Sequence, residues 1–168
     1  GESIEDKAFK GCKNLINVTI EDGLINIGSY AFADCSGLTN LQIGNGVKTI
    51  GAHAFSGCSS LKNLEIGTSV ETINTAAFNG CDSLIDLVIP NNVTKIQYSA
   101  FGNCSKLKNI TIGEGITVIG EAAFKNCAEL RNVYWNALKC NTVGSSSSIL
   151  YNNAIFDKLL QSLNELYP

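Results

Sequence analysis

Apolar residues recur along this chain at a fixed period of 23 residues, without insertion or deletion, over most of its length. Each unit contains an Ala-Phe pair, a cysteine three residues after the phenylalanine, and a leucine three residues after the cysteine. The phenylalanines of the six copies are Phe9, Phe32, Phe55, Phe78, Phe101 and Phe124. A period of this length with several apolar columns in step indicates a solenoid, in which each copy forms one coil and stacked coils bury a continuous core.

The apolar spacing changes within one unit, as residues 31–50 illustrate. In residues 31–38 the apolar positions are i, i+1, i+4 and i+7, which is the spacing of one helical face and predicts one or two short helical turns. Residues 40–43 alternate between polar and apolar and predict a short strand. After a turn at Asn45-Gly46, residues 47–50 predict a second brief extended segment. Stacking places the strands of successive coils in a parallel sheet, about 4.8 Å apart.

Together the columns read L-x-x-I-x-I…V-x-x-I-G-x-x-A-F-x-x-C, a pattern that resembles the BspA-type leucine-rich repeats. This class is associated with bacterial surface antigens and also occurs in protist surface proteins. The resemblance covers about residues 4–135, and the A-F-x-x-C element is specific to the class. It implies a right-handed α/β leucine-rich repeat solenoid with a parallel sheet on its concave face. The proline that often follows the strand in this family occurs only as Pro90, with Gly44, Gly67 and Gly113 at the equivalent positions.

The 168 residues are enough for one domain with a sizeable core. We predict that residues 1–135 form the six-coil array, which begins part-way through a unit and so indicates a piece of a longer protein with an uncovered first coil. Residues 136–168 are assigned to the same domain, with a Ser-rich loop at 144–148 and an amphipathic helix at 153–167 that caps the last coil. The alternative is a linker helix that leads to another domain.

Six of the seven cysteines occupy one column: Cys12, Cys35, Cys58, Cys81, Cys104 and Cys127. Free cysteine packs as a small hydrophobe, so we predict that these six are buried, unpaired and unreactive. Disulfides along the stack are the alternative, because adjacent Cα atoms about 5 Å apart lie within bridging range. Cys140 lies outside the column and is the thiol predicted to be reachable. No Cys-x-x-Cys pair or histidine at a ligand spacing indicates a metal site.

The single histidine, His53, is a poor candidate for catalysis. Its column holds Lys7, Tyr30, His53, Ala76, Ser99 and Ala122. This variety predicts an exposed, unconstrained position, and one copy of a varying column does not supply a nucleophile, a base and an orienting group. The 16 glycines follow the repeat turns and form no phosphate-binding loop. We therefore predict no enzyme activity and no cofactor.

The charge balance argues against nucleic acid as a partner. The chain has 12 basic and 15 acidic residues, a net charge of −3 and a pI near 5.1, the wrong sign for a phosphate backbone. The sequence also contains no apolar run long enough to cross a membrane. Of the functions considered, this leaves the binding of a macromolecule through the outward-facing residues of the sheet.

One outward column is almost uniform: Asn17, Asn40, Asn63, Asp86, Asn109 and Asn132. We interpret it as an amide ladder that holds adjacent coils in register rather than as a binding site. The flanking columns vary and supply the candidate binding surface, which consists of Ile16, Thr19, Gln42, Lys62, Glu65, Ile85, Val88, Lys108, Thr111, Arg131 and Tyr134. Among these, Ile85 with Val88 and Arg131 with Tyr134 are the predicted anchors.

Two functions follow from this reading. A shallow surface on which charges nearly cancel suits a protein or a glycan better than a small ligand, which needs a concave pocket. The favoured function is therefore an adhesion-type module of a secreted or cell-surface protein, and the family resemblance implies host or matrix proteins as its partners. The alternative is a spacer that holds another domain away from the surface and binds nothing. The uniform asparagine column and the few outward aromatics favour this alternative.

Overall fold

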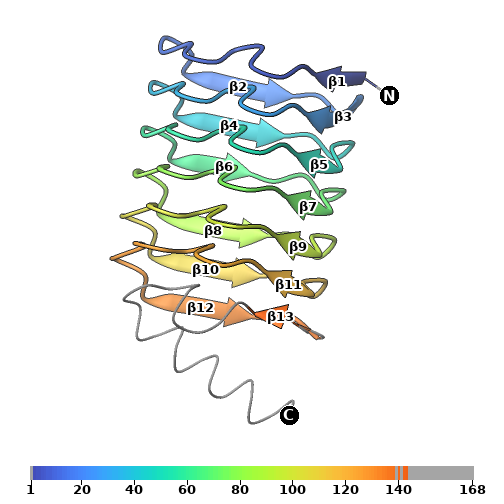
Figure 1. The fold of residues 1–168 in the computed structure, drawn as a ribbon, viewed down its shortest axis with the longest axis vertical. Coiled ribbons are helices and arrows are strands. Elements are labelled where there is room, and N and C mark those ends of the chain that lie inside the picture. The colour runs from blue at the N-terminus through green and yellow to red at the C-terminus, as the bar shows by residue number, and fades with distance from the viewer. Residues whose placement is uncertain (1, 139, 141, 144–168) are drawn as a thin grey trace.

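The computed structural model describes residues 2–138, 140, 142 and 143. In that part the chain winds into six stacked coils, and each coil contributes one strand to each of two facing layers (Figure 1). A further strand, β13, follows the sixth coil and adds a seventh strand to one layer. The even-strand face consists of β2 (Asn17–Ile20), β4 (Asn40–Ile43), β6 (Asn63–Glu65), β8 (Asp86–Ile89), β10 (Asn109–Ile112) and β12 (Asn132–Trp135). The odd-strand sheet consists of β1 (Glu2–Ile4), β3 (Leu24–Ile27), β5 (Thr49–Ile50), β7 (Thr72–Ile73), β9 (Lys95–Ile96), β11 (Val118–Ile119) and β13 (Thr142–Val143).

All strand pairs are parallel, and a shift of one repeat aligns neighbouring strands. Asn17 pairs with Asn40 in the even-strand layer, and Ile27 pairs with Ile50 in the odd-strand sheet. The predicted strand at 40–43 is confirmed, and the predicted second segment forms as the two-residue β5. The odd-strand sheet is continuous over seven strands. Its last pair joins Ile119 to Val143, a separation of 24 rather than 23 residues.

The predicted helical turns do not form: the described residues contain no helix. Residues 28–38 and their counterparts form a series of turns, because alternate N–H groups bond to the next coil instead of along the segment. Phe32 donates its N–H to the carbonyl of Ala54 at 2.7 Å, whereas Ala33 donates to the carbonyl of Tyr30 at 3.1 Å. Positive φ angles of 58° at Tyr30 and 59° at Asp34 also exclude a continuous right-handed helix.

The column of His53 is therefore not unconstrained, and this expectation was wrong. Its members have φ angles between 52° and 59° in all six coils. Ala76 and Ala122 are only 5% exposed, and Ser99 is 9% exposed. The ring of His53 stacks on that of Tyr30, with centroids 4.6 Å apart and 4° between the ring planes. His53 is thus a packing residue in a turn with a positive φ angle.

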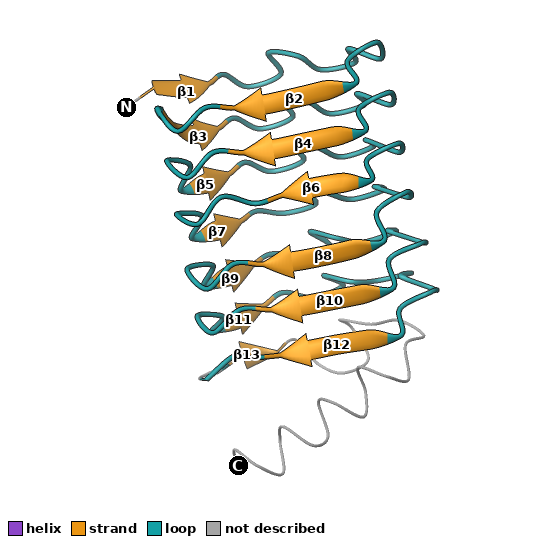
Figure 2. Cartoon of the chain, turned by 180° about the vertical axis from the view of Figure 1, so that it is seen from behind, coloured by secondary structure: helices purple, strands orange, loops and turns teal. Residues whose placement is uncertain are grey.

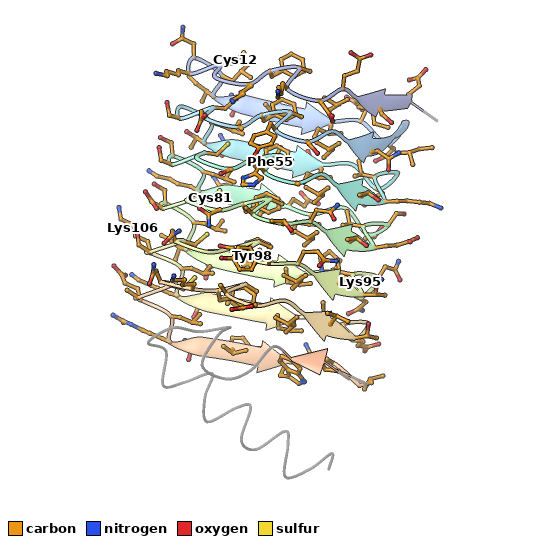
Figure 3. The ribbon with its side chains drawn as sticks, viewed as in Figure 1. Cys12, Phe55, Cys81, Lys95, Tyr98 and Lys106 are labelled. Carbon is orange, nitrogen blue, oxygen red and sulfur yellow. The ribbon has the colours of Figure 1, made fainter. Side chains whose placement is uncertain are left out.

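Phenylalanine and cysteine form two inward columns along the stack. Adjacent phenylalanine rings stack with centroids 5.0–5.6 Å apart. Each buried cysteine directs its Sγ toward the phenylalanine carbonyl of the coil before, as Cys58 does to Phe32 at 3.3 Å. Figure 3 shows Cys81 and Phe55 inside the stack. This direction leaves Cys35, Cys58, Cys81 and Cys104 as buried free thiols, as predicted.

Cys12 is the exception in this column, because it is exposed. It lies in the first described coil, at the N-terminal end of the stack (Figure 3). Phe9 of the same coil is 43% exposed. Cys140, which we predicted to be the reachable thiol, is half-buried, with its Sγ 3.8 Å from the carbonyl of Thr117. The prediction of six protected cysteines therefore holds for five.

The first described coil presents apolar side chains at its outer end. A groove of about 380 Å³ opens there, with Ile4, Phe9, Leu15, Val18 and Leu24 among its lining residues. The predicted Ser-rich loop and capping helix at 144–168 lie outside the described residues and stay predictions. The assignment of 1–135 and 136–168 to one domain likewise stays a prediction.

Candidate binding surface

Strand alternation places the predicted binding residues on one side of the stack, which Figure 2 shows with the even-numbered strands in front. In β4, Leu41 and Ile43 point inward and are each 2% exposed, while Gln42 between them is exposed. The candidates that are exposed are Ile16, Thr19, Gln42, Lys62, Glu65, Ile85, Val88, Arg131 and Tyr134, and those that are half-buried are Lys108 and Thr111. The candidate set therefore forms one surface, the even-strand face.

Exposed apolar side chains are concentrated on this face. Ile16 is 58% exposed, Val88 62%, Tyr134 58% and Ile85 42%. Ile85 and Val88 belong to the same coil and are three residues apart, near the middle of the stack. Large apolar side chains left in water on an otherwise polar surface mark interaction sites.

Lys108 is less available to a ligand than its sequence position suggests. Its Nζ lies 3.6 Å from Oε2 of Glu129, and the two side chains are 39% and 46% exposed. An ion pair this exposed contributes about 0–1 kcal/mol to stability, but it neutralises the charge locally. Sequence reasoning missed Glu129, because it belongs to the turn before β12 and not to the strand columns.

The asparagine column forms the predicted ladder. The Nδ2 group of an asparagine in this column donates to the Oδ1 atom of the coil before: Asn40 to Asn17 at 2.6 Å and Asn63 to Asn40 at 2.5 Å. Asn132 donates to Asn109 in the same way at 2.8 Å. An amide both donates and accepts, so identical amides one coil apart satisfy each other. These hydrogen bonds support the structural role that we assigned to the column.

The ladder and the even-strand layer are both interrupted between β6 and β8. Pairing divides the layer into one sheet of β2, β4 and β6 and another of β8, β10 and β12. Figures 1 and 2 both show a wider space between β6 and β8 than between other neighbouring even-numbered strands. We call this junction, with residues 62–65 on one side and 85–88 on the other, the seam.

Asp86 explains the interruption of the ladder. It accepts a hydrogen bond from Nδ2 of Asn109 at 2.6 Å, as an asparagine in its place would. An ionised carboxylate has no hydrogen to donate, however, so it has none to offer Oδ1 of Asn63 in the coil before. In the described part of the chain, no hydrogen bond joins Asn63 to Asp86.

The backbone changes at the same place. Lys108 donates its N–H to the carbonyl of Ile85 at 2.8 Å, and the same bond forms between the other described coils of this face. The equivalent bond from Ile85 to Lys62 does not form. After the strands, Asn136 donates its N–H to Ile112 at 3.1 Å, whereas Pro90 at the equivalent position has no N–H.

A second ladder, in the turn after the even strands, also changes at the seam. The N–H of Thr68 bonds to Oδ1 of Asn45 at 3.0 Å. Beyond the seam, the N–H of Glu114 bonds to Oδ1 of Asn91 at 3.1 Å. At the seam this position is occupied by Thr68, which has no side-chain amide oxygen to accept such a bond from the next coil. Asn92 instead donates a hydrogen bond from Nδ2 to the backbone carbonyl of Thr68 at 2.7 Å.

The seam opens the core slightly. Leu64 is half-buried, although Leu41 and Leu87 in the neighbouring coils are each 2% exposed. An open groove of about 640 Å³ runs over β2, β4 and β6 and ends at the seam, where Lys62, Leu64, Glu65 and Asp86 contribute to its lining. The other side of the stack stays closed there, because β7 pairs with β9 and the rings of Phe55 and Phe78 stack at 5.2 Å.

The chemistry of this face is limited to hydrogen bonding, apolar contact and a few charges. No group of three His, Cys, Asp or Glu side chains within the described residues could hold a metal ion. Residues 2–138, 140, 142 and 143 also contain no helix that is long and apolar enough to span a membrane.

Comparison with known families identifies the repeat. The model of the BspA type leucine-rich repeat region matches residues 2–154 in six copies. The chain belongs to this family. None of the curated proteins compared with it matches.

Solved structures of bacterial proteins share the coil of this BspA-type chain. A leucine-rich repeat protein of Treponema pallidum superposes with a TM-score of 0.83 at 28% identity, over 96% of this chain and 76% of that one. A leucine-rich cell surface protein of Faecalibacterium prausnitzii gives a TM-score of 0.67 at 29% identity, over 82% of this chain and 43% of that one. The pneumococcal vaccine antigen PcpA, at 24% identity, a TM-score of 0.65 and 80% and 32% coverage, shares the fold.

Proposed function

We propose that this chain is a non-catalytic binding module of a secreted or cell-surface protein, and that it binds a protein or a glycan through the even-strand face. The observation that carries the proposal is the placement of Ile16, Ile85, Val88 and Tyr134, which are 42–62% exposed on this one face. Burial of such side chains against a partner provides binding energy that a fully polar surface lacks.

The contrast between the inner and outer columns supports this function. The inward columns keep the same residue type from coil to coil, whereas the outward positions of residues 16, 39, 62, 85, 108 and 131 carry Ile, Thr, Lys, Ile, Lys and Arg. Packing requires the uniform columns, but it does not require this change of side chain on the surface. A surface that differs from coil to coil can recognise a partner of defined shape.

The groove favours a macromolecular ligand. It is an open depression of about 640 Å³ along the strands, and its lining includes the side-chain amides of asparagine and glutamine residues and a few charged side chains. Small molecules bind in sites that enclose most of their surface. We infer no catalytic role, because His53 lies in the turn segment and the groove lining contains no histidine or cysteine.

The relatives support an extracellular location. The Faecalibacterium protein is described as a cell surface protein and PcpA as a vaccine antigen. This chain spans 43% and 32% of those two proteins. We therefore place the module in a secreted or surface-attached protein, with host or matrix proteins as its partners.

The test is a binding screen with matched variants. Immobilised chain is exposed to purified extracellular matrix proteins and to a glycan array, together with the double variant Ile85→Ser/Val88→Ser and the variant Tyr134→Ser. Each variant should weaken binding about tenfold or more, as loss of an interface anchor does. Tyr98→Ser is the control, because Tyr98 is 53% exposed but follows β9, away from the even-strand face. Binding that none of the face variants changes would contradict the proposal.

The spacer function has one observation in its favour. The amides of the ladder bond to one another, so the most regular column of the face offers few free groups to a ligand. A spacer predicts that the chain binds none of the matrix proteins or glycans in the screen. It also predicts that Ile85→Ser/Val88→Ser improves solubility without any loss of function.

A further inference from the structure

We propose that the seam between β6 and β8 binds an arginine side chain that a partner protein presents on an extended segment. The proposal rests on the proposed function and narrows it to one place on the even-strand face and to one class of partner. Four features of the seam carry it: acceptors without a donor in the neighbouring coil, a net negative charge, flanking apolar side chains and unpaired backbone groups.

The seam presents hydrogen-bond acceptors without donors. Asn63 uses Nδ2 for its bond to Asn40, which directs its Oδ1 away from that coil and toward Asp86. Asp86 uses one carboxylate oxygen to accept from Asn109, and its other oxygen remains. Among the described residues, no donor reaches Oδ1 of Asn63. Elsewhere in the ladder the next asparagine fills this position with its own N–H group.

The negative charge of the seam favours a positively charged hydrogen-bond donor. The charged residues in the lining of the groove are Lys62, Glu65 and Asp86, which together carry a net charge of −1. Within the described chain, neither acidic residue has an ion-pair partner. A guanidinium has five N–H donors in a planar fork, so it can bond a carboxylate with two parallel hydrogen bonds and still reach a neighbouring amide oxygen. The single ammonium of lysine cannot match both acceptors in this way.

The apolar residues beside the seam favour a peptide over a free cation. Val88 is 62% exposed and Ile85 is 42% exposed on one side, and half-buried Leu64 lies on the other. The three methylene groups of arginine can cover such a surface while the guanidinium stays at the carboxylate. An apolar residue next to the arginine would contact the remainder of this apolar surface.

The strand edges at the seam fit an extended backbone. The carbonyl of Lys62 and the N–H of Ile85 do not bond to each other, unlike the equivalent pairs of the other coils. The rings of Phe55 and Phe78 hold these two coils together at 5.2 Å, so a segment does not insert between the strands; it lies across the outer surface of the face, where the unpaired groups can bond to its main chain. The groove over β2, β4 and β6 leads up to this point and can receive the rest of the segment.

The experiment uses the intact chain, labelled with ¹⁵N, and the tripeptide acetyl-Val-Arg-Val-amide as probe. Titration followed by NMR should shift the backbone amides of residues 62–65 and 85–88 and the side-chain amide of Asn63. The same peptide with citrulline in place of arginine keeps the shape but lacks the charge, and it should bind about tenfold more weakly or worse.

The decisive variant is Asp86→Asn, with Asp82→Asn as the control for charge. Asp82 is exposed in the turn before β8 and does not line the groove. Asp86→Asn should weaken arginine-peptide binding by about tenfold or more, while Asp82→Asn should leave it unchanged. Because an asparagine at 86 completes the amide ladder, this variant should melt no lower than the parent, so that lost binding cannot be attributed to unfolding.

Three results would overturn this inference: equal binding of the arginine and citrulline peptides, undiminished binding by Asp86→Asn, or shifts confined to Tyr134 and Arg131. The last result would leave the proposed function intact, because binding would still occur on the even-strand face. Seam shifts with chito-tetraose and none with the peptide would assign the seam to a glycan and overturn the inference likewise. A failure of every protein and glycan in the screen would remove the proposed function as well.

Discussion

The side-chain amide of Asn109 donates a hydrogen bond to the carboxylate of Asp86 across 2.6 Å, and Asp86 has no hydrogen with which to continue the row to Asn63. Asp86 thus has a carboxylate oxygen where the asparagines of the column have an amide nitrogen, and this position coincides with the boundary between two three-stranded sheets. Pro90, four residues later, removes a backbone donor from the same boundary. The array therefore consists of two blocks of three coils, which the odd-strand sheet and the phenylalanine stack hold together.

Asp86→Asn should stabilise the chain. The new Nδ2 group can donate to Oδ1 of Asn63 and extend the ladder, and one added hydrogen bond contributes about 1 kcal/mol to the free energy of unfolding. Urea unfolding measures the change, and amide hydrogen exchange at residues 63 and 85–86 should slow. Asp82→Asn, which removes the same charge from an exposed turn, should change stability by less than about 0.5 kcal/mol. A destabilised Asp86→Asn chain would show that Asp86 has a structural role at the seam.

Phe78 and Phe9 should respond very differently to truncation, although they occupy the same column. Phe78 is 0% exposed, and its ring stacks on Phe55 and Phe101 at 5.2 Å on either side. Phe78→Ala should cost about 3–5 kcal/mol, as for other buried phenylalanines. Phe9 is 43% exposed and stacks only on Phe32, so Phe9→Ala should cost about 1 kcal/mol. Urea titration compares the two, and equal costs would contradict the open first coil.

Leu41 and Ile43 show which part of the fold the sequence could predict. Their alternation with polar neighbours and their recurrence every 23 residues determine both the strand and its register. The turn segments were misread because Phe32 and Cys35 point inward in a helix and in this series of turns alike. A helix and this series of turns differ in the acceptor of the Phe32 N–H group, which here is the carbonyl of Ala54 in the next coil. The local spacing of apolar residues does not indicate which acceptor is used.

The candidate surface was predictable to a similar degree. Alternation alone placed Val88 and Tyr134 outward, and both are exposed. The sequence also showed Asp86 as the one acidic member of its column. The sequence did not show which neighbouring coil loses a hydrogen bond because of Asp86. In the structure, Nδ2 of each asparagine in the ladder points to the preceding coil. The missing donor of Asp86 therefore weakens its boundary with the coil before, at Asn63, and not its boundary with the coil after, at Asn109. The exposure of Cys12 likewise depends on which neighbours a coil has, not on its own residues.

Thiol labelling of the native protein should modify Cys12 first. Cys12 is exposed, whereas Cys35, Cys58, Cys81 and Cys104 are buried. Burial also raises the pKa of Cys58 to about 12, so that little reactive thiolate exists at neutral pH. Mass spectrometry after brief exposure to iodoacetamide should find the modification in the peptide that contains Cys12, and Cys12→Ser should remove that rapid phase. Rapid modification of Cys81 would indicate that the core opens readily.

Stability should fall at alkaline pH because of the same thiols. Desolvation raises the pKa of Cys58 from 9.0 to about 12 and that of Cys81 well above 9.0, so the folded state favours the neutral form. The unfolded chain ionises from about pH 9, and the free energy of unfolding is therefore at its full value below pH 9 and decreases between pH 9 and about 12. Urea midpoints at about pH 8 and about pH 10.5 measure the loss. Cys81→Ala should reduce it.

Gly80 and Gly67 are glycines for two different physical reasons, which alanine substitution can separate. Gly80 has a φ of +76°, and a Cβ there would lie 3.7 Å from the nitrogen of Gly57, an ordinary contact. Gly80→Ala should therefore cost about 1 kcal/mol, from positive φ alone. Gly80→Asn should cost less, since Asn103 and Asn126 adopt φ of 58° and 60° at the equivalent position.

A Cβ at Gly67 would instead overlap the carbonyl oxygen of Gly44 in the coil before. Gly67→Ala must push the two coils apart and should cost about 2 kcal/mol or more, because backbone cannot move aside as a flexible side chain can. Urea unfolding of the variants should rank Gly67→Ala below Gly80→Ala and Gly80→Ala below Gly80→Asn. The reverse order of the two alanine variants would mean that the coils are spaced loosely at Gly67, and that turn geometry rather than close stacking limits the stability of this solenoid.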